Sequence, residues 1–523
     1  MIRASEQFHA IANGSVRPLD WDCNISFTKE RDNNRNWFIL NESTLDGGDL
    51  LSMNEDQPIQ LWDFYKYDNY KDRLLSMSIT RSVKFPYSVQ SAIADITLDN
   101  HDGLFSINNE DSPISEYILP ARPMRLYMGF KNVENLPQFV GLTEQVPSYT
   151  GINNNTAHIT AMDFLSSIGD MTLQSTLMMR DVRTDEAIEM ILQQFGLDTS
   201  MYELDMGSNV IPFLLFEKGK NAGNALSELV LAENGKLWLS ETGIIRFSPR
   251  VSDLGKMPVM VFNESNIIDY KPSALDGIYN RVKVKSEIRK VQANQPIFSQ
   301  DNENGYNSEN DTYRVKANNS LVVWLTLEDP AWTANVNPTL NGGNTGSHFT
   351  ALALDGSRVS IGVTATGELF ADSIKMTFTN ENSFPVSISF LQIWGEPAKV
   401  VDNIEYDAYD DESIEKYGEK VLDISDNKFF GSYENVDNFA TTILRQRAKY
   451  SPDCTIRVKD NPALQIDDIV IVNWKGYDTY KVTSVKRKLS QKGLETELGL
   501  ERFEILVPFI LNESILNGED RLG

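Results

Sequence analysis

The sequence predicts a mainly β protein with minor α content, and three observations lead to that fold class. Short runs of valine, isoleucine, threonine, tyrosine and phenylalanine follow one another, separated by glycine, asparagine, aspartate and proline. Amphipathic helical spacing stands out in only three segments. Residues 320–397 form a succession of alternating strand-like runs without a helical pattern, which is typical of a small β-sandwich with its own core.

The expected helices are Thr184–Phe195, Ala222–Glu233 and Val436–Lys449, each with apolar residues along one side. In the first, Thr184 can cap the opening amides, acidic residues follow at the positive end of the helix dipole, and a glycine ends the helix. A hairpin is expected directly after the second helix, with its turn at residues 241–243.

A polar segment, residues 291–312, predicts an exposed loop or linker before the sandwich. The strands expected in the sandwich are 321–327, 349–354, 358–363, 373–378 and 386–394. At Gly395-Glu396-Pro397 a different style of sequence resumes. The sandwich is therefore expected to be an insertion in a host domain that continues on both sides.

One repeat is clear, because residues 38–47 recur as residues 509–518 with eight of ten positions identical. Two copies so far apart are not a solenoid, which needs several units at a fixed period. Two interpretations stay open. The copies are strand-and-turn pieces with similar needs, or they have one equivalent packing or subunit-contact role.

The bulk properties exclude some classes of protein. A formal net charge of −26 argues against tight nucleic-acid binding, which needs lysine and arginine at phosphates, although it also fits simple solubility. No segment approaches the roughly 20 apolar residues that span a bilayer. The first residues lack the apolar stretch of a signal peptide, so synthesis in the cytoplasm is expected.

The motifs of catalysis and metal binding are missing, and the sequence predicts no enzyme, no metal site and no cofactor. Cys23 and Cys454 lie in separate strand-like runs and are expected to be core thiols, not a disulfide. His158 lies in an alternating strand and reads as a surface or satisfied histidine. The acidic stretches 99–103 and 301–311 do not match a calcium loop and are expected to be turns.

Aromatic residues of the sandwich allow two interpretations. Trp324, Trp332 and Trp394 can form a sugar-stacking face, which makes them candidate carbohydrate contacts. A core role is also open, since Trp324 and Trp394 lie in apolar alternating strands.

The order of motifs resembles that of phage tail hub proteins, which include the N-terminal part of tail-associated lysins. Leu98-Asp99-Asn100, Gly103-Leu104-Phe105-Ser106, Pro120-Ala121-Arg122-Pro123-Met124-Arg125-Leu126 and Phe139-Val140-Gly141 follow the order of the family's first barrel. Residues 413–418, 461–470 and 480–485 resemble cues of its second barrel. The family commonly has Gly-Asp before the valine, where this chain has Asp467-Asp468.

This resemblance implies two tail-tube-like β-barrels, a small α/β linking domain and the inserted β-sandwich. The implied domains are a first barrel with an N-terminal arm (1–166), the linking domain (167–255), a second barrel (256–290 plus 398–505), a linker with the sandwich (291–397) and a C-terminal tail (506–523). Many relatives carry a peptidoglycan hydrolase after the second barrel. None is expected here, because no hydrolase motif was found.

The implied function is structural: a homotrimeric hub at the tail tip or baseplate of a virion. Three copies with two barrels each would match a sixfold tail tube to a threefold tip and line an acidic channel for DNA. The implied partners are a second and third copy, a tail tube or distal tail protein, a tape-measure protein, and tip, spike or fibre proteins. Two alternatives stay open: a receptor- or carbohydrate-binding tail protein acting through the sandwich, and a cell-wall hydrolase.

Overall fold

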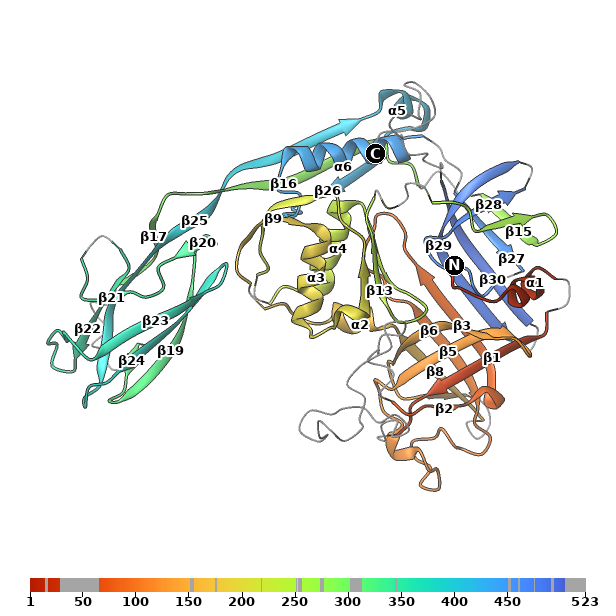
Figure 1. Ribbon diagram of the computed structural model, residues 1–523, viewed down its shortest axis with the longest axis horizontal. Coiled ribbons are helices and arrows are strands. Elements are labelled where there is room, and N and C mark those ends of the chain that lie inside the picture. The colour runs from red at the N-terminus through yellow and green to blue at the C-terminus, as the bar shows by residue number, and fades with distance from the viewer. Residues whose placement is uncertain are drawn as a thin grey trace.

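The computed structural model is built mainly of β-strands, as the sequence predicted, and its parts lie along an extended molecule (Figure 1). Two β-rich units lie at one end, a helical domain lies in the middle, and a β-sandwich lies at the other end. The structure describes residues 1–14, 17–28, 65–150, 155–174, 176–217, 219–250, 252, 256–272, 277–301, 313–343, 346–449, 453–459, 461–474, 476–490 and 493–503. The repeat at 38–47 and 509–518 lies outside these residues, as does most of 301–311.

The first β-rich unit, called the first barrel below, curls around one apolar core. It consists of α1 (Glu6–Asn13), β1 (Leu19–Ile25), β2 (Asp68–Asn69), β3 (Leu74–Ser82), β4 (Ile93–Asp99), β5 (Pro123–Phe130), β6 (Asn135–Thr143), β7 (Ser148–Thr150) and β8 (Thr156–Met162). Alternate residues of these strands point inward, so Cys23 of β1 shares the core with Met77 of β3 and Ile96 of β4. Strands β1, β3 and β4 therefore face the same interior.

The second β-rich unit, called the second barrel below, is assembled from two separate parts of the chain. It consists of β14 (Met260–Asn263), β15 (Ile267–Pro272), β27 (Cys454–Val458), β28 (Ile469–Asn473), β29 (Tyr477–Ser490) and β30 (Gly493–Arg502). Its core contains Phe262, Ile456, Val482 and Leu498. Cys23 and Cys454 are both buried and unpaired, one in each barrel, as predicted for core thiols.

The central domain holds the largest core. It contains α2 (Phe164–Gly169), β9 (Met179–Arg183), α3 (Thr184–Gln194), β10 (Tyr202–Leu204), β11 (Val210–Leu214), α4 (Ala222–Glu233), β12 (Lys236–Leu239) and β13 (Ile245–Ser248). The apolar sides of α3 and α4 meet in this core, where Ile188 and Leu226 are fully buried. The expected turn after β12 is present, with Gly243 at a φ of 88°.

A long two-stranded arm crosses the central domain and continues into the sandwich (Figure 1). It is formed by β16 (Arg281–Val291) and the 24-residue β25 (Val386–Tyr409), with β26 (Val421–Ile424) parallel to β16 and the helices α5 (Asp411–Tyr417) and α6 (Tyr433–Arg447). Val284 of β16, Ile404 of β25 and Phe439 of α6 belong to the core of the central domain. The second half of β25 and helix α6, both within residues 398–449, therefore pack on the central domain.

The inserted domain has two sheets that enclose one core. The first contains β17 (Gln295–Asp301), β18 (Arg314–Val315), β20 (Ala331–Ala334), β21 (Thr339–Leu340), β22 (His348–Ala353) and the first half of β25. The second contains β19 (Asn319–Thr326), β24 (Ser373–Asn380) and β23 (Val363–Leu369), in that spatial order. Between the sheets, the ring centres of Phe349 and Phe378 lie 5.7 Å apart. The core is that of a β-sandwich.

Several local expectations differ from the structure. Thr184 does not cap α3, because its hydroxyl donates to the Asn209 carbonyl at 3.4 Å, whereas the Arg183 amide donates to the Glu186 carboxylate. Residues 358–363 are not a strand: only Arg358 forms a bridge, and Gly362 has a φ of 72°, so the strand begins at Val363. β25 runs through Pro397, which lies opposite Ala331.

No helix of the part described is both long and apolar enough to cross a membrane.

Candidate functional site

The two barrels share one sheet, and this junction is the most distinctive feature of the molecule. β29 of the second barrel pairs antiparallel with β3 of the first, from Ser484 opposite Ser82 to Leu489 opposite Met77. The pairing joins strands some 400 residues apart in sequence into a single 14-stranded sheet. Because backbone hydrogen bonds cross the boundary, the barrels are one continuous wall and not two domains that merely touch.

Both barrels contribute four strands to this wall in the same order. In the first barrel the spatial order is β3-β4-β8-β7, which is first, second, fourth and third along the chain. In the second barrel it is β15-β27-β30-β29, again first, second, fourth and third. Every one of these pairings is antiparallel. These four strands of the second barrel thus repeat the arrangement of the four strands in the first, displaced along the sheet.

Of the eight strands just compared, the two outermost are β15 and β7. Within the described residues, β15 pairs only with β27 and β7 only with β8. By the shared strand order, β15 corresponds to β3 and β7 to the end of β29. An open edge strand offers unpaired amide and carbonyl groups to another strand. Among the described residues, both outermost strands therefore have a free edge of this kind.

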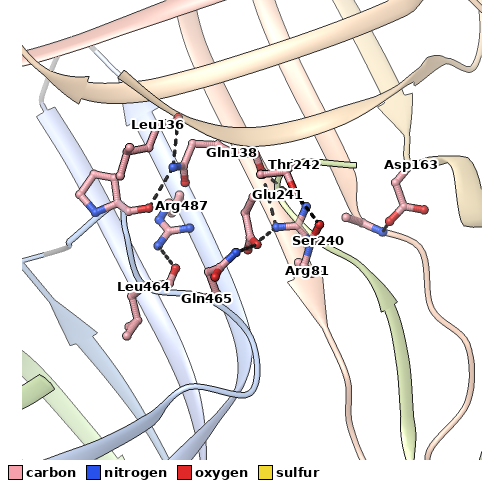
Figure 2. A network of polar contacts seen from close by, with 12 residues as sticks. Arg81, Leu136, Gln138, Asp163, Ser240, Glu241, Thr242, Leu464, Gln465 and Arg487 are labelled. Atoms are coloured by element: carbon pink, nitrogen blue, oxygen red, sulfur yellow. Dashed lines mark hydrogen bonds and ion pairs between the residues drawn. The ribbon is translucent and has the colours of Figure 1, made fainter. Parts of the chain in front are cut away.

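A buried polar network fixes the internal junction (Figure 2). Glu241, in the turn between β12 and β13, is fully buried, and its two carboxylate oxygens accept from Arg81 and Gln465, each at 2.6 Å. Arg81 lies on β3 and Gln465 in the loop before β28. The central domain thus inserts one carboxylate between the barrels, where a cation from one and an amide from the other neutralise and bind it.

Near this carboxylate, one further polar contact joins the two barrels and another holds a loop of the second barrel. The Gln138 amide on β6 donates to the Pro462 carbonyl at 2.9 Å. Arg487 on β29 is almost fully buried, and its guanidinium donates to the Leu464 carbonyl at 2.8 Å. The carbonyls that accept these bonds belong to residues 461–470, the stretch that resembles a second-barrel cue. This stretch contacts the first barrel at Gln138 and the central domain at Glu241.

Asp467 stands where the tail-hub motif that this stretch resembles commonly has glycine. Its φ of 70° lies in the left-handed region that favours glycine, and aspartate is one of the few other residues that tolerates it. Burial favours the neutral form, but Lys236 at 2.9 Å, Lys256 at 2.6 Å and Lys481 together lower the pKa of Asp467 well below its usual range. Asp467 is therefore a buried anion that ties the central domain to the second barrel.

The solvent face of the shared wall is polar and mixed in charge. Asp269, Arg457, Glu497 and Lys486 stand opposite one another across β15, β27, β30 and β29, and Thr80 of β3 continues the row. A neighbouring row contains Glu495, Lys488, Ser78 and Asp95. The charges in these two rows alternate in sign.

The residues considered for chemistry have structural roles. His158 faces away from the core, where its ring nitrogens lie 3.0 Å from the Thr97 hydroxyl and 2.7 Å from that of Thr150. Burial raises the pKa of Cys23 to about 12, so its thiol is not activated. Residues 99–103 form a turn in which Asp102 binds Arg73. Among the described residues, no group of three His, Cys, Asp or Glu side chains could hold a metal ion.

The structure does not bring the three candidate tryptophans together. Trp324 lies on β19 with 48% of its surface exposed. Trp332 lies on β20 in the other sheet, half-buried, with the Arg180 guanidinium 4.3 Å from its ring centre. Trp394 lies on β25, and its indole N–H donates to Gln392 at 2.9 Å. The three indoles therefore have different surroundings, and Trp332 is used in a contact between domains.

Comparison with known proteins gives related structures but no related sequence. No family model matches the sequence, and no curated protein matches it. The structure is similar to the 43 kDa tail protein of prophage MuSo2 from Shewanella oneidensis, with a TM-score of 0.43 and 11% identity over 84% of this chain and 95% of that one. It is also similar to a tail protein from Neisseria meningitidis, with a TM-score of 0.46 and 10% identity over 84% and 94%.

A third similar structure is a component of the type VI secretion system from E. coli, with a TM-score of 0.36 and 7% identity over 83% of this chain and 74% of that one.

The sequence offered no signal for the junction. Arg81 and Glu241 are single charged residues among many, and nothing near either one in sequence indicates that they meet. Two β-rich segments were expected, but the pairing of β29 with β3 depends on which edges meet in three dimensions. The repeated strand order of the two segments points to the junction, but this order can be recognised only once the strand pairings are known.

Proposed function

We propose that the chain is a structural hub protein of a tail tip or baseplate, which joins a sixfold tail tube to a threefold tip. One observation carries the proposal: two barrels lie side by side in one continuous wall, and each contributes four strands to it in the same order. A chain that contains two equivalent units contributes two positions to a ring. Three copies then supply six equivalent positions while the whole assembly keeps threefold symmetry.

The open edges support a homotrimer. In a closed ring, β15 of one copy pairs with β7 of the next, which repeats between chains the junction that β29 and β3 form within a chain. This is a head-to-tail contact, which closes when the rotation between neighbours divides the circle. Edge strands that pair in this way are also protected from aggregation.

The polar face of the wall supports a channel for DNA. In a ring, the side of the wall opposite the barrel cores faces the centre. Its charges alternate in sign, so it offers passing DNA no continuous band of cations, and the phosphate contacts that give tight binding are not available. DNA is then transient cargo. The tail tube or distal tail protein, the tape-measure protein, and tip, spike or fibre proteins are the remaining partners of such a hub, in the tail of a virion assembled in the host cytoplasm.

Mass measurement with an edge variant tests the ring. Ile268 on β15 is 53% exposed, so an aspartate there leaves the barrel core intact but places a charge at the proposed seam. The wild-type chain is expected to give a native mass of three times 59.1 kDa, and Ile268→Asp a single chain. Val322→Asp is the matched control, since Val322 is 50% exposed on the sandwich, and this variant should stay trimeric.

Two results would contradict the proposal. One is a wild-type chain that stays monomeric both alone and when mixed with assembled tail tubes. The other is a reconstruction of the assembly in which the two barrels of a chain occupy positions that sixfold rotation does not relate.

A further inference from the structure

The outer face of the β19-β24-β23 sheet is exposed and has an unusual composition. The sheet lies in the sandwich, at the end of the molecule away from the barrels (Figure 1). The inner residues of its strands, among them Leu325, Met376 and Phe378, form the sandwich core. The alternate residues point outward, and within the described part of the chain no other strand or helix pairs with β19 on its outer edge.

Three rows of side chains cross this face. The pairings place Ser320, Thr379 and Thr364 in the first row, Val322, Thr377 and Thr366 in the second, and Trp324, Lys375 and Glu368 in the third. Five of the nine residues are hydroxyl-bearing. Ser320 and Thr379 lie within hydrogen-bonding distance of each other at 2.9 Å. A stretch of hydroxyls therefore adjoins one aromatic ring and one pair of opposite charges.

Trp324 is held as a platform at the edge of this face. Its ring centre lies 5.3 Å from that of Phe370, at an angle of 40°, so a neighbouring ring supports it from one side. With 48% of its surface exposed, its indole still offers a large apolar area to solvent. A rigid, supported and exposed tryptophan loses little conformational freedom on binding, which is why such residues are frequent in recognition sites.

The chemistry of the face fits a saccharide better than a protein partner. A pyranose ring has an apolar side that stacks on an aromatic ring, and hydroxyl groups around its rim that exchange hydrogen bonds with threonines, lysine and carboxylate. The buried centres of stable protein interfaces are more apolar than this and poor in charged residues. Here Val322 is the one exposed aliphatic residue in the three rows, so the face lacks such a centre.

We propose that this face binds a saccharide, with Trp324 stacking on a sugar ring and Lys375, Glu368 and the threonine rows binding its hydroxyls. The site does not include Trp332 or Trp394, whose indoles are engaged by Arg180 and Gln392. The proposal is independent of the hub function, because it uses only the inserted sandwich. It gives that insertion a role at a cell surface.

Binding to an array of bacterial capsular, teichoic and lipopolysaccharide glycans tests the site on the full chain. The wild type is expected to bind at least one glycan. Trp324→Ala should weaken that binding about tenfold or more, whereas Trp324→Phe keeps a ring and should retain most of it. Trp332→Ala is the matched control, because it removes an indole of equal size from the same domain and should leave binding unchanged. Thermal unfolding of each variant shows that the sandwich stays folded.

Three outcomes overturn the proposal. They are a wild type that binds no glycan on the array, binding that Trp324→Ala leaves intact, and binding that Trp332→Ala removes to the same degree. Sedimentation adds a further check. If the chain associates with itself and Trp324→Ala abolishes that association, the face is covered by a second copy and not by a sugar.

Discussion

Glu241 shows how much a single buried residue can determine. Its carboxylate is fully buried and lies between an arginine of the first barrel and a glutamine of the second. A buried ion pair adds little stability compared with a well-packed apolar pair, but removing one partner leaves an uncompensated charge in the interior. The position of the two barrels therefore depends on both charges being present together.

Arg81→Met is expected to destabilise the protein by about 3–5 kcal/mol, because it leaves the Glu241 carboxylate buried with Gln465 as its one strong partner. Denaturant unfolding followed by fluorescence measures this. The double variant Arg81→Met with Glu241→Leu removes both charges and should recover most of the loss. A single variant that costs no more than the double one would show that the charge is not what matters.

Asp163 is expected to make stability depend on pH. It accepts from the amides of Ala92 at 2.6 Å and Leu165 at 3.1 Å, and burial raises its pKa to about 6. Between about pH 4 and 6 the unfolded chain releases this proton first, so the folded state binds more protons and stability falls as pH rises.

Asp163→Asn removes this titration and should lack that part of the pH dependence. The variant loses one hydrogen bond at every pH. Its free energy of unfolding relative to that of the wild type should nevertheless rise by up to about 3 kcal/mol between pH 4 and pH 7. Unfolding curves at four pH values measure the difference. Parallel pH profiles for the two proteins would exclude Asp163 as the source.

At the scale of elements, the close approach of β6 to β8 requires a glycine. A Cβ atom on Gly141 would lie 2.2 Å from the Met162 carbonyl oxygen, which is backbone and cannot move aside easily. Gly141→Ala is expected to cost about 1–3 kcal/mol or more, measured as a lower midpoint of thermal unfolding. Gly343→Ala is the control, because a Cβ there meets no atom within 4 Å. Equal midpoints for both variants would contradict the geometry.

Elements with strong local signals were predictable from sequence. The helix at Ala222–Glu233 agrees at both ends, because its apolar spacing is regular and Asn234 ends it in the left-handed conformation. The prediction of a strand at 358–363 was wrong, because apolar content alone does not show that the chain turns at Gly362. Thr184 was a good capping residue by type, but its hydroxyl is used by the Asn209 carbonyl.

The candidate sites were less predictable than the elements. The sequence named three tryptophans as possible sugar contacts, and only Trp324 keeps a large exposed surface. Trp332 has the same side chain and a similar strand context, but it packs near Met178, Ala371 and Ala398 at a domain contact. Such differences arise from how the sandwich lies on the central domain, which no local pattern encodes.

At the scale of the molecule, a small contact holds the sandwich against the central domain. The Arg180 guanidinium lies 4.3 Å from the Trp332 ring and 5.3 Å from that of Phe213, and the Ala371 amide donates to the Thr176 carbonyl at 2.7 Å. The buried part of this cluster is limited to three residues. Contacts of this size between domains generally allow relative motion when they are weakened.

Trp332→Ala is expected to release the sandwich from the central domain without unfolding either one. Small-angle X-ray scattering should show a larger radius of gyration and a broader distance distribution than for wild type. Trp324→Ala is the matched control and should leave the scattering profile unchanged, since Trp324 lies on the other sheet. Superimposable profiles for wild type and Trp332→Ala would show that the arm alone sets the position of the sandwich.

The arm that connects these domains has a mechanical consequence. β25 runs unbroken for 24 residues, about 80 Å at ~3.3 Å per residue, and shares its backbone pairing first with the sandwich and then with β16 over the central domain. A force that acts on the sandwich along the arm is therefore transmitted through two paired strands, β16 and β25, which run parallel to that force. Because β-strands are already nearly fully extended, the arm can bend but can lengthen very little under tension. Tension on the sandwich is therefore passed on to the central domain.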